Sequence, residues 1–325
     1  MRAPILWRNR MNRHTKALHL WAIAAMLFFC ILLYRCGSPD TETAKQISVF
    51  VSIAPQKYFA ERIGAAHISV TVMAPPGASP HSYEPKPSQM VALSKGDIYL
   101  AIGVEFEHAW LERIARLNSS MTIVHLEQSV SKIEMPAFEQ AIIEHEDDSE
   151  KGYKAHDHSH HHGHEGADPH IWLSPGCVLK MGKVTAASFA AAAPQYAREF
   201  EKNYAAFSDT IKALISDIEG LLKQSPQKTF MVFHPSWGYF ARDFNLRQLP
   251  IEFEGKEPSL KELGILTRVA RDNNIQAIFV QPQMSQKAAA RIAQHIGAKL
   301  TTADPLAEDW ADNLRTLAKA IAGND

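Results

Sequence analysis

Short apolar runs alternate with helical patterns along most of this chain of 325 residues. The apolar runs are rich in β-branched and aromatic residues, and the run at 68–73 is stopped by a Pro-Pro-Gly sequence, which is typical of buried strands. The predicted strands are 47–53, 68–73, 97–102, 122–125, 229–233, 249–253, 277–280 and 299–302.

Helical patterns fill most of the intervals between these runs. The two longest are adjacent: 176–193 begins after Pro175 and stops at Pro194, and 195–222 has an apolar residue at every third or fourth position. The shorter predicted helices are 56–63, 87–95, 259–272, 286–296 and 307–321. Since strands that alternate with helices favour parallel β-α units, we predict an α/β fold. It has two β-α (Rossmann-like) lobes with central parallel sheets, joined by one long helix.

The same patterns predict how the chain is divided. We expect a signal or membrane-anchor segment at 1–37, a polar tether at 38–46, an N-terminal lobe at 47–175, a linking helix at 176–194 and a C-terminal lobe at 195–325. Within the N-terminal lobe, residues 139–166 present no apolar face and are rich in histidine and acidic residues. Such a composition predicts a disordered loop.

The first 37 residues have the pattern of an export signal. Five basic residues between positions 2 and 16 precede an apolar run at 20–34, and no acidic residue occurs before Asp40. The run is shorter than the ~18 residues expected of a spanning helix. We therefore expect the protein in the periplasm or on the outer face of the cytoplasmic membrane. Cys36 stands where a lipoprotein signal places its cysteine, but Arg35 before it is atypical, so lipid anchoring, an uncleaved anchor and unusual cleavage all stay open.

Overall composition excludes some partners and some kinds of site. The formal net charge is −1, which gives no electrostatic reason to expect a nucleic-acid partner. Two of the three cysteines lie in the export segment, which leaves Cys177 alone in the mature chain. One thiol forms neither an internal disulfide nor a thiolate metal site, so a metal site here has to use histidine and carboxylate.

Four candidate ligands stand out by their positions. His81, His234 and Asp304 each lie near the carboxyl end of a predicted strand, where open α/β sheets place their ligand sites. His170 follows the histidine-rich segment, and all four have a proline next to them, which stiffens the backbone that holds each side chain. Asp168 is placed to orient a ligating imidazole, although it is equally suited to capping the helix that follows.

The composition of this set favours zinc. Three imidazoles and one carboxylate suit Zn2+ in tetrahedral geometry, whereas Mn2+ prefers more oxygen ligands, so manganese is the alternative cargo. A zinc hydrolase is the alternative of a different class, since three histidines and an open water position would serve catalysis. The chain contains no HExxH sequence and no evident base or nucleophile, so we predict that it is not an enzyme.

Four segments resemble the metal-binding solute-receptor family of ABC importers (TroA-like), in particular its zinc-uptake (ZnuA-like) branch. They are GASPHSYEPKPSQM, DPHIWLSP, FHPSWGYF and TTADPL, they contain the four candidate ligands in order, and the resemblance extends from about residue 47 to 321. It implies two lobes bridged by the helix at 176–193, with Zn2+ bound between them as cargo for the membrane permease of an ABC importer. It also implies His81, His170 and His234 as ligands with Asp304 as a fourth, and we expect a monomer.

Gln281 and the histidine-rich insert are two features on which this chain is compared with the family. Many relatives carry glutamate where this chain has Gln281, so here Asp304 or a water has to complete the set of ligands. Zinc-type relatives also often carry a histidine-rich insert before the second ligand. The insert predicts a secondary, low-affinity site for zinc, or else a linker with no dedicated role. Its histidines are His156, His158, His160, His161, His162 and His164.

The secondary site gives a first prediction. Deletion of residues 146–165 is expected to remove weakly bound Zn2+, seen as a lower stoichiometry in equilibrium dialysis, because imidazoles are the zinc ligands of that segment. If the shortened chain binds as many zinc ions as the full chain, the segment is a linker only.

Overall fold

A computed structural model describes residues 21, 26, 45–135, 167–223, 225–252, 256–283 and 286–323. Residues Gln46–Asp325 form one compact unit, and Met1–Lys45 is a separate unit that is described only at three positions. Apart from residues 21 and 26, the predicted export segment therefore lies outside the described residues. The histidines of the histidine-rich segment lie outside them as well. In the part of the chain that is described, no helix is both long enough and apolar enough to cross a membrane.

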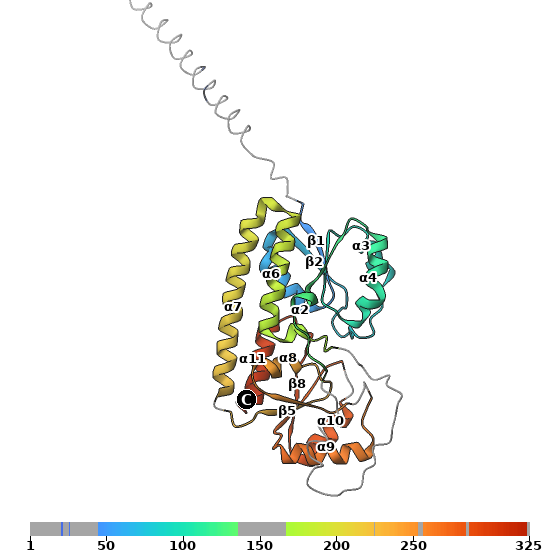
Figure 1. Ribbon diagram of the computed structural model, residues 1–325, viewed down its shortest axis with the longest axis vertical. Helices are drawn as coiled ribbons and strands as arrows, with labels where there is room; N and C mark the ends of the chain where they lie inside the picture. The colour runs from blue at the N-terminus through green and yellow to red at the C-terminus, as the bar shows by residue number, and fades with distance from the viewer. Residues whose placement is uncertain are drawn as a thin grey trace, which may run out of the picture. The chain divides into compact units, whose positions relative to one another are not determined.

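The N-terminal lobe is built on a parallel sheet of four described strands (Figure 1). Its order is β2-β1-β3-β4, so the first strand lies inside the sheet and the chain moves outward from it on both sides. The strands are β1 (Ile47–Val51), β2 (Ile68–Val72), β3 (Ile98–Ala101) and β4 (Thr122–His125), and the helices are α2 (Ala54–Gly64), α3 (Pro87–Leu93) and α4 (Glu105–Leu117). All four predicted strands are confirmed, and α4 is a helix that the sequence analysis did not identify.

The C-terminal lobe repeats this arrangement. A second parallel sheet has the order β6-β5-β7-β8, again with its first strand inside. Its strands are β5 (Thr229–Val232), β6 (Arg247–Pro250), β7 (Ala277–Val280) and β8 (Lys299–Thr302). Its helices are α8 (Gly238–Asp243), α9 (Leu260–Asp272), α10 (Lys287–Ile296) and α11 (Trp310–Ile321). The predicted fold of two parallel β-α lobes is confirmed, whereas the predicted strand 249–253 begins two residues earlier than expected and α8 was missed.

Two long helices connect the lobes (Figure 1). They are α6 (Pro175–Ala192) and α7 (Ala197–Lys223), separated by the short turn at Pro194 that the sequence predicts. Ser174 caps α6, since its Oγ accepts the backbone N–H of Cys177 at 2.9 Å, and Pro175 fits the first turn, where a backbone N–H is not required. The sequence therefore specifies where the linking helix starts.

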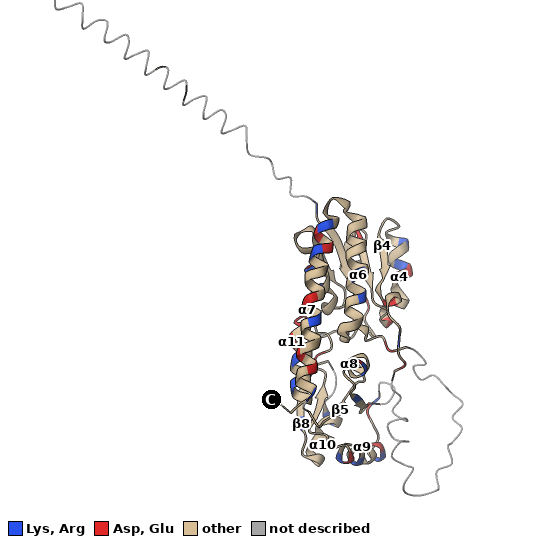
Figure 2. Ribbon diagram, turned by 60° about the vertical axis from the view of Figure 1, so that its left-hand side comes forward, with Lys and Arg blue, Asp and Glu red and all other residues tan. Residues whose placement is uncertain are grey.

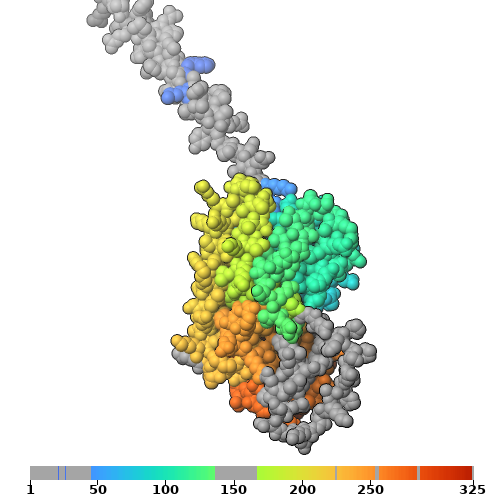
Figure 3. All heavy atoms as spheres, viewed as in Figure 1, coloured from blue at the N-terminus to red at the C-terminus, as the bar shows by residue number. Residues whose placement is uncertain are grey.

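The two helices pack against each other through aromatic and polar contacts. Phe189 of α6 meets Phe200 of α7 with 5.7 Å between ring centroids, and the hydroxyl of Tyr204 donates to the carbonyl of Leu179 at 3.0 Å. Both acidic and basic residues occur along α7 in Figure 2, as expected of a helix with one face in solvent. In the space-filling view the yellow surface of the pair extends beside both lobes (Figure 3).

One hydrophobic core runs through the N-terminal lobe, both long helices and the near side of the C-terminal sheet. Its C-terminal members include Phe230, Trp237 and Trp310. A second, smaller core lies in the C-terminal lobe and contains residues of β6, α9 and α10 such as Leu249, Leu266 and Ile292. Because the larger core is continuous, the carboxyl ends of the two sheets are held in a fixed relation to each other.

The shared core predicts the effect of a mutation in α7. Phe200→Ala should lower the free energy of unfolding by about 3–5 kcal/mol, because it leaves a cavity between α6 and α7 where Phe200 is fully buried. Urea unfolding of the purified protein measures this, with Lys202→Ala, an exposed position of the same helix, as the control. Equal stability of the two variants would contradict the packing described.

Candidate metal site

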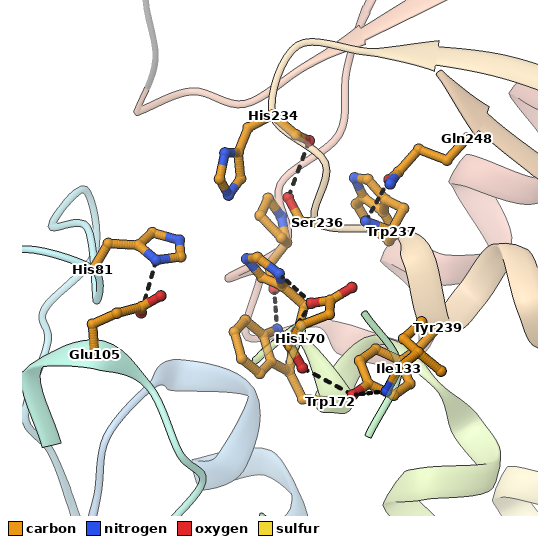
Figure 4. A network of polar contacts seen from close by, with 12 residues as sticks. His81, Glu105, Ile133, His170, Trp172, His234, Ser236, Trp237, Tyr239 and Gln248 are labelled. Atoms are coloured by element: carbon orange, nitrogen blue, oxygen red, sulfur yellow. Dashed lines mark hydrogen bonds and ion pairs between the residues drawn. The ribbon is translucent and has the colours of Figure 1, made fainter. Parts of the chain in front are cut away.

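Three imidazole rings converge between the lobes (Figure 4). His81 follows β2, His170 precedes α6, and His234 follows β5. Their ring centroids are 5.1–5.3 Å apart in all three pairs, and one nitrogen of each ring lies within 4.8 Å of the corresponding nitrogens of the other two. Tetrahedral zinc would need these nitrogens about 3.3 Å apart, so a small inward shift closes the set around an ion. Among the described residues, no carboxylate or thiol belongs to this group.

His81 is held by a carboxylate from the neighbouring helix. Its Nδ1 lies 2.8 Å from Oε2 of Glu105, in the first turn of α4, and its backbone N–H donates to Ser79 Oγ at 3.3 Å. Burial alone would raise the pKa of Glu105, but the hydrogen bond and the charge of His81 outweigh it and lower the pKa to about 2. Glu105 is therefore ionised and fixes the orientation of the imidazole.

His170 is the most buried of the three. Its Nδ1 and its backbone N–H both lie within hydrogen-bond distance of Asp168 Oδ1, at 2.8 and 2.9 Å, and both side chains are almost fully enclosed. Burial lowers the pKa of His170 well below 6.5, helped by the charges of the two other imidazoles, so the ring is neutral and able to bind a metal. Burial also raises the pKa of Asp168 to about 7, against the hydrogen bond from the backbone of His170. Asp168 thus lies within hydrogen-bond distance of the imidazole that it is predicted to orient.

His234 is paired in the same way. Its Nδ1 is hydrogen bonded to Oε1 of Glu252, a buried carboxylate two residues beyond β6. Its Nε2 is also buried and has no hydrogen-bond partner among the described residues. A buried ring nitrogen without a partner is costly, so this atom is suited to bind an ion that enters the site.

The three carboxylates set the chemistry of the rings. A carboxylate accepts hydrogen bonds, so each Nδ1 carries the proton and each Nε2 keeps its lone pair. Carboxylates that bond metal-binding histidines in this way orient the ring and raise its basicity. The arrangement therefore presents three nitrogen donors, and the ionised carboxylate of Glu105 beside His81 adds a negative charge that attracts a cation.

Two tryptophans tie the His170 segment to the C-terminal lobe. The indole N–H of Trp172 donates to the carbonyl of Pro305 at 2.7 Å, and that of Trp310 donates to the carbonyl of Trp172 at 2.7 Å. The hydroxyl of Tyr239 in α8 donates to the carbonyl of Asp168 at 2.8 Å. His170 is thus anchored to the lobe that carries His234, whereas His81 belongs to the other lobe.

The fourth predicted ligand, Asp304, lies outside the group of three histidines. Its Oδ1 accepts the backbone N–H of Leu306 at 2.9 Å and the amide N–H of Gln283 at 3.1 Å. A small cavity of about 40 Å³ adjoins His81 and His170, and Gln281, Gln283 and Pro305 complete part of its wall. Gln283 therefore lines the cavity, and Asp304 is hydrogen bonded to Gln283 without lining the cavity itself.

Sequence reasoning missed Glu105 and Glu252 as partners of ligands. Glu105 follows a predicted strand, which allowed it to face the site without requiring it, whereas Glu252 falls inside the predicted strand 249–253 and lies beyond the strand only because β6 ends at Pro250. Glu107, two residues after Glu105, does not face the site, because its carboxylate accepts the backbone N–H groups of Ile102 and Gly103. The residues of the predicted secondary site, His156 to His164, lie outside the described residues.

A converging set of histidines between two β-α lobes joined by a long helix defines a metal-binding solute receptor. The family model for the zinc-uptake complex component A, periplasmic (ZnuA), matches residues 49–324. The chain therefore belongs to the ZnuA family, a family of uptake components and not of enzymes, as the sequence predicted.

Curated relatives are about a quarter identical to this chain over the aligned residues. The zinc-binding lipoprotein AdcA of Streptococcus pneumoniae serotype 4 is 25% identical over 279 residues, which cover 85% of this chain and 53% of AdcA. A putative metal-binding protein of Treponema pallidum is 27% identical over 288 residues, which cover 86% of this chain and 87% of that protein. This chain thus spans about half the length of AdcA and most of the Treponema protein.

Solved structures share the fold. A crystal structure of ZnuA superposes with a TM-score of 0.75 at 39% identity, covering 86% of this chain and 100% of that one. A zinc-bound deletion mutant of ZnuA gives 0.74 at 39% identity, with coverage of 86% and 97%. The laminin-binding protein Lmb of Streptococcus agalactiae, at 21% identity and a TM-score of 0.70, covering 86% of this chain and 99% of that chain, shows the fold alone.

The close packing of Gly238 against Asp168 gives a prediction for the site. A Cβ at Gly238 would lie 2.7 Å from Asp168 Oδ2, so Gly238→Ala should displace the carboxylate that orients His170. Zinc affinity is then expected to fall by about 10–100-fold, as when other carboxylate partners of ligands are disturbed. Competition with a chromophoric chelator measures it, and Gly264→Ala, in open space on α9, is the control. Unchanged affinity with intact folding would contradict the orienting role.

Proposed function

We propose that this chain is an extracytoplasmic solute-binding protein that captures Zn2+ through Nε2 of His81, His170 and His234 and delivers it to an ABC-type importer. The observation that carries the proposal is the pairing of each Nδ1 with a carboxylate, which leaves the other nitrogen of each ring free to face the other two rings. Membership of the zinc-uptake family and the zinc-bound relative support it.

The donor set favours zinc over manganese. Three imidazoles with at most one oxygen suit a borderline-soft ion in tetrahedral geometry, whereas manganese suits carboxylate, carbonyl and water. The nearby carboxylates of Glu105, Asp168 and Glu252 are hydrogen bonded to the rings, so they act on the ion through the imidazoles. The site thus combines nitrogen ligands with a negative surrounding field.

Capture fits this geometry better than hydrolysis. The cavity beside the histidines has a volume of only about 40 Å³, which holds a few waters and no substrate of ordinary size. A hydrolase also needs a base close to the metal-bound water, and the three carboxylates nearest the rings are all engaged with Nδ1 atoms. We therefore do not propose catalysis.

Delivery requires that the protein work outside the cytoplasm beside its permease. The amino-terminal pattern and the periplasmic description of the family support export, and the relative AdcA is named a lipoprotein. We propose that residues 1–37 direct export, that Cys36 is the point of any lipid anchor, and that the folded receptor acts as a monomer with the predicted lobes 47–175 and 195–325.

Competitive metal titration tests the proposed function. The metal-free mature protein should bind Zn2+ in preference to Mn2+, and His234→Ala should lower the zinc affinity by about 100-fold or more, since loss of a partner residue alone costs 10–100-fold. His295→Ala, an exposed histidine of α10, is the matched control.

Preference for manganese would contradict the assignment of the cargo. A zinc affinity that is unchanged in the His234→Ala variant would contradict the assignment of the ligands.

A further inference from the structure

The three histidines leave one position of a tetrahedral ion to be filled. Asp304 is the acid that the sequence assigns to it, yet the described acids contribute no oxygen to the group of converging nitrogens. The cavity that adjoins His81 and His170 is lined by the side chain of Gln283, and Asp304 is absent from its wall. This cavity is therefore a place from which a fourth donor could reach the ion.

Gln283 presents an amide oxygen without a partner. Its Nε2 donates to Oδ1 of Asp304 at 3.1 Å, which fixes which end of the amide is nitrogen, because a carboxylate only accepts. Its Oε1 is buried and has no hydrogen-bond partner among the described residues. A buried carbonyl oxygen left in this way costs free energy unless something binds it.

Asp304 is in turn held in place by its own loop. Its Oδ1 accepts the backbone N–H of Leu306 at 2.9 Å, and its backbone carbonyl accepts the side-chain N–H of Asn313 at 2.7 Å. The carboxylate therefore has a fixed position from which it orients Gln283. Hydrogen bonds thus connect Leu306, in the loop after β8, through Asp304 to Gln283 at the cavity.

We propose that Gln283 supplies the neutral oxygen that completes the fourth position around the captured ion, and that Asp304 is the positioning residue that orients its amide. This proposal rests on the proposed function and adds a ligand to the same site. An amide oxygen in place of a carboxylate leaves the site with fewer anionic oxygens, which disfavours manganese relative to zinc. Gln283 lies just past the end of β7, as His234 lies just past the end of β5.

A double-mutant cycle separates Gln283 from Asp304. Gln283→Ala should weaken Zn2+ binding by about tenfold. Asp304→Ala removes the oxygen that accepts the side-chain N–H of Gln283, so it should weaken binding by no more than Gln283→Ala. In the Gln283→Ala background, Asp304→Ala should have no further effect, because the two residues act as one unit.

Spectroscopy of the Co2+ form provides a second readout. Gln283→Ala should shift the visible absorption bands, which respond to the ligands, whereas Gln276→Ala, an exposed glutamine just before the start of β7, should leave spectrum and affinity unchanged. Two results would overturn the proposal. One is that Gln283→Ala changes neither affinity nor spectrum, and the other is that Asp304→Ala keeps its full effect in the Gln283→Ala background.

Failure of this proposal is distinguishable from failure of the proposed function. If the unmodified protein binds zinc tightly and His234→Ala abolishes that binding, the receptor function stands whatever Gln283 does. If the unmodified protein prefers manganese, or if His234→Ala leaves the zinc affinity unchanged, the proposed function itself is wrong.

Discussion

The hydrogen bond between each imidazole Nδ1 and a carboxylate is the interaction on which the site depends. Without it a histidine ring rotates and exchanges its proton between two nitrogens, and three rings would not share one target. Here Glu105, Asp168 and Glu252 fix the three rings. The three rings therefore face a common region before any ion arrives, and only a small shift is needed to bind it, which reduces the cost of binding.

This requirement explains much of the fold around it. Three rings and three carboxylates have to come from different parts of the chain, and parallel sheets provide this because their strands all end on the same edge. The continuous core through α6 and α7 holds the two edges opposite each other, and Trp172 and Tyr239 fasten the His170 segment to the C-terminal lobe. Cation capture thus depends on core packing as well as on the ligands.

The sequence predicted the strands well because each is a short apolar run bounded by turn residues, and it located the linking helix because Pro175 and Pro194 flank it. It missed α4, whose first turn carries acids that look like loop residues. Pairwise partners are harder to predict, since the meeting of His234 with Glu252 depends on strands β5 and β6 lying side by side. The hydrogen bond between Gln283 and Asp304 depends on the geometry of two loops, which no local sequence pattern specifies.

The central claim is that one ion is held by three imidazole nitrogens without sulfur. Zinc K-edge X-ray absorption of the mature protein, loaded with less than one equivalent of Zn2+ so that the strongest site fills first, measures the donors directly. The account predicts three imidazole nitrogens and one further light donor at about 2.0–2.2 Å. Fewer than three imidazoles, or a sulfur donor near ~2.3 Å, would contradict it.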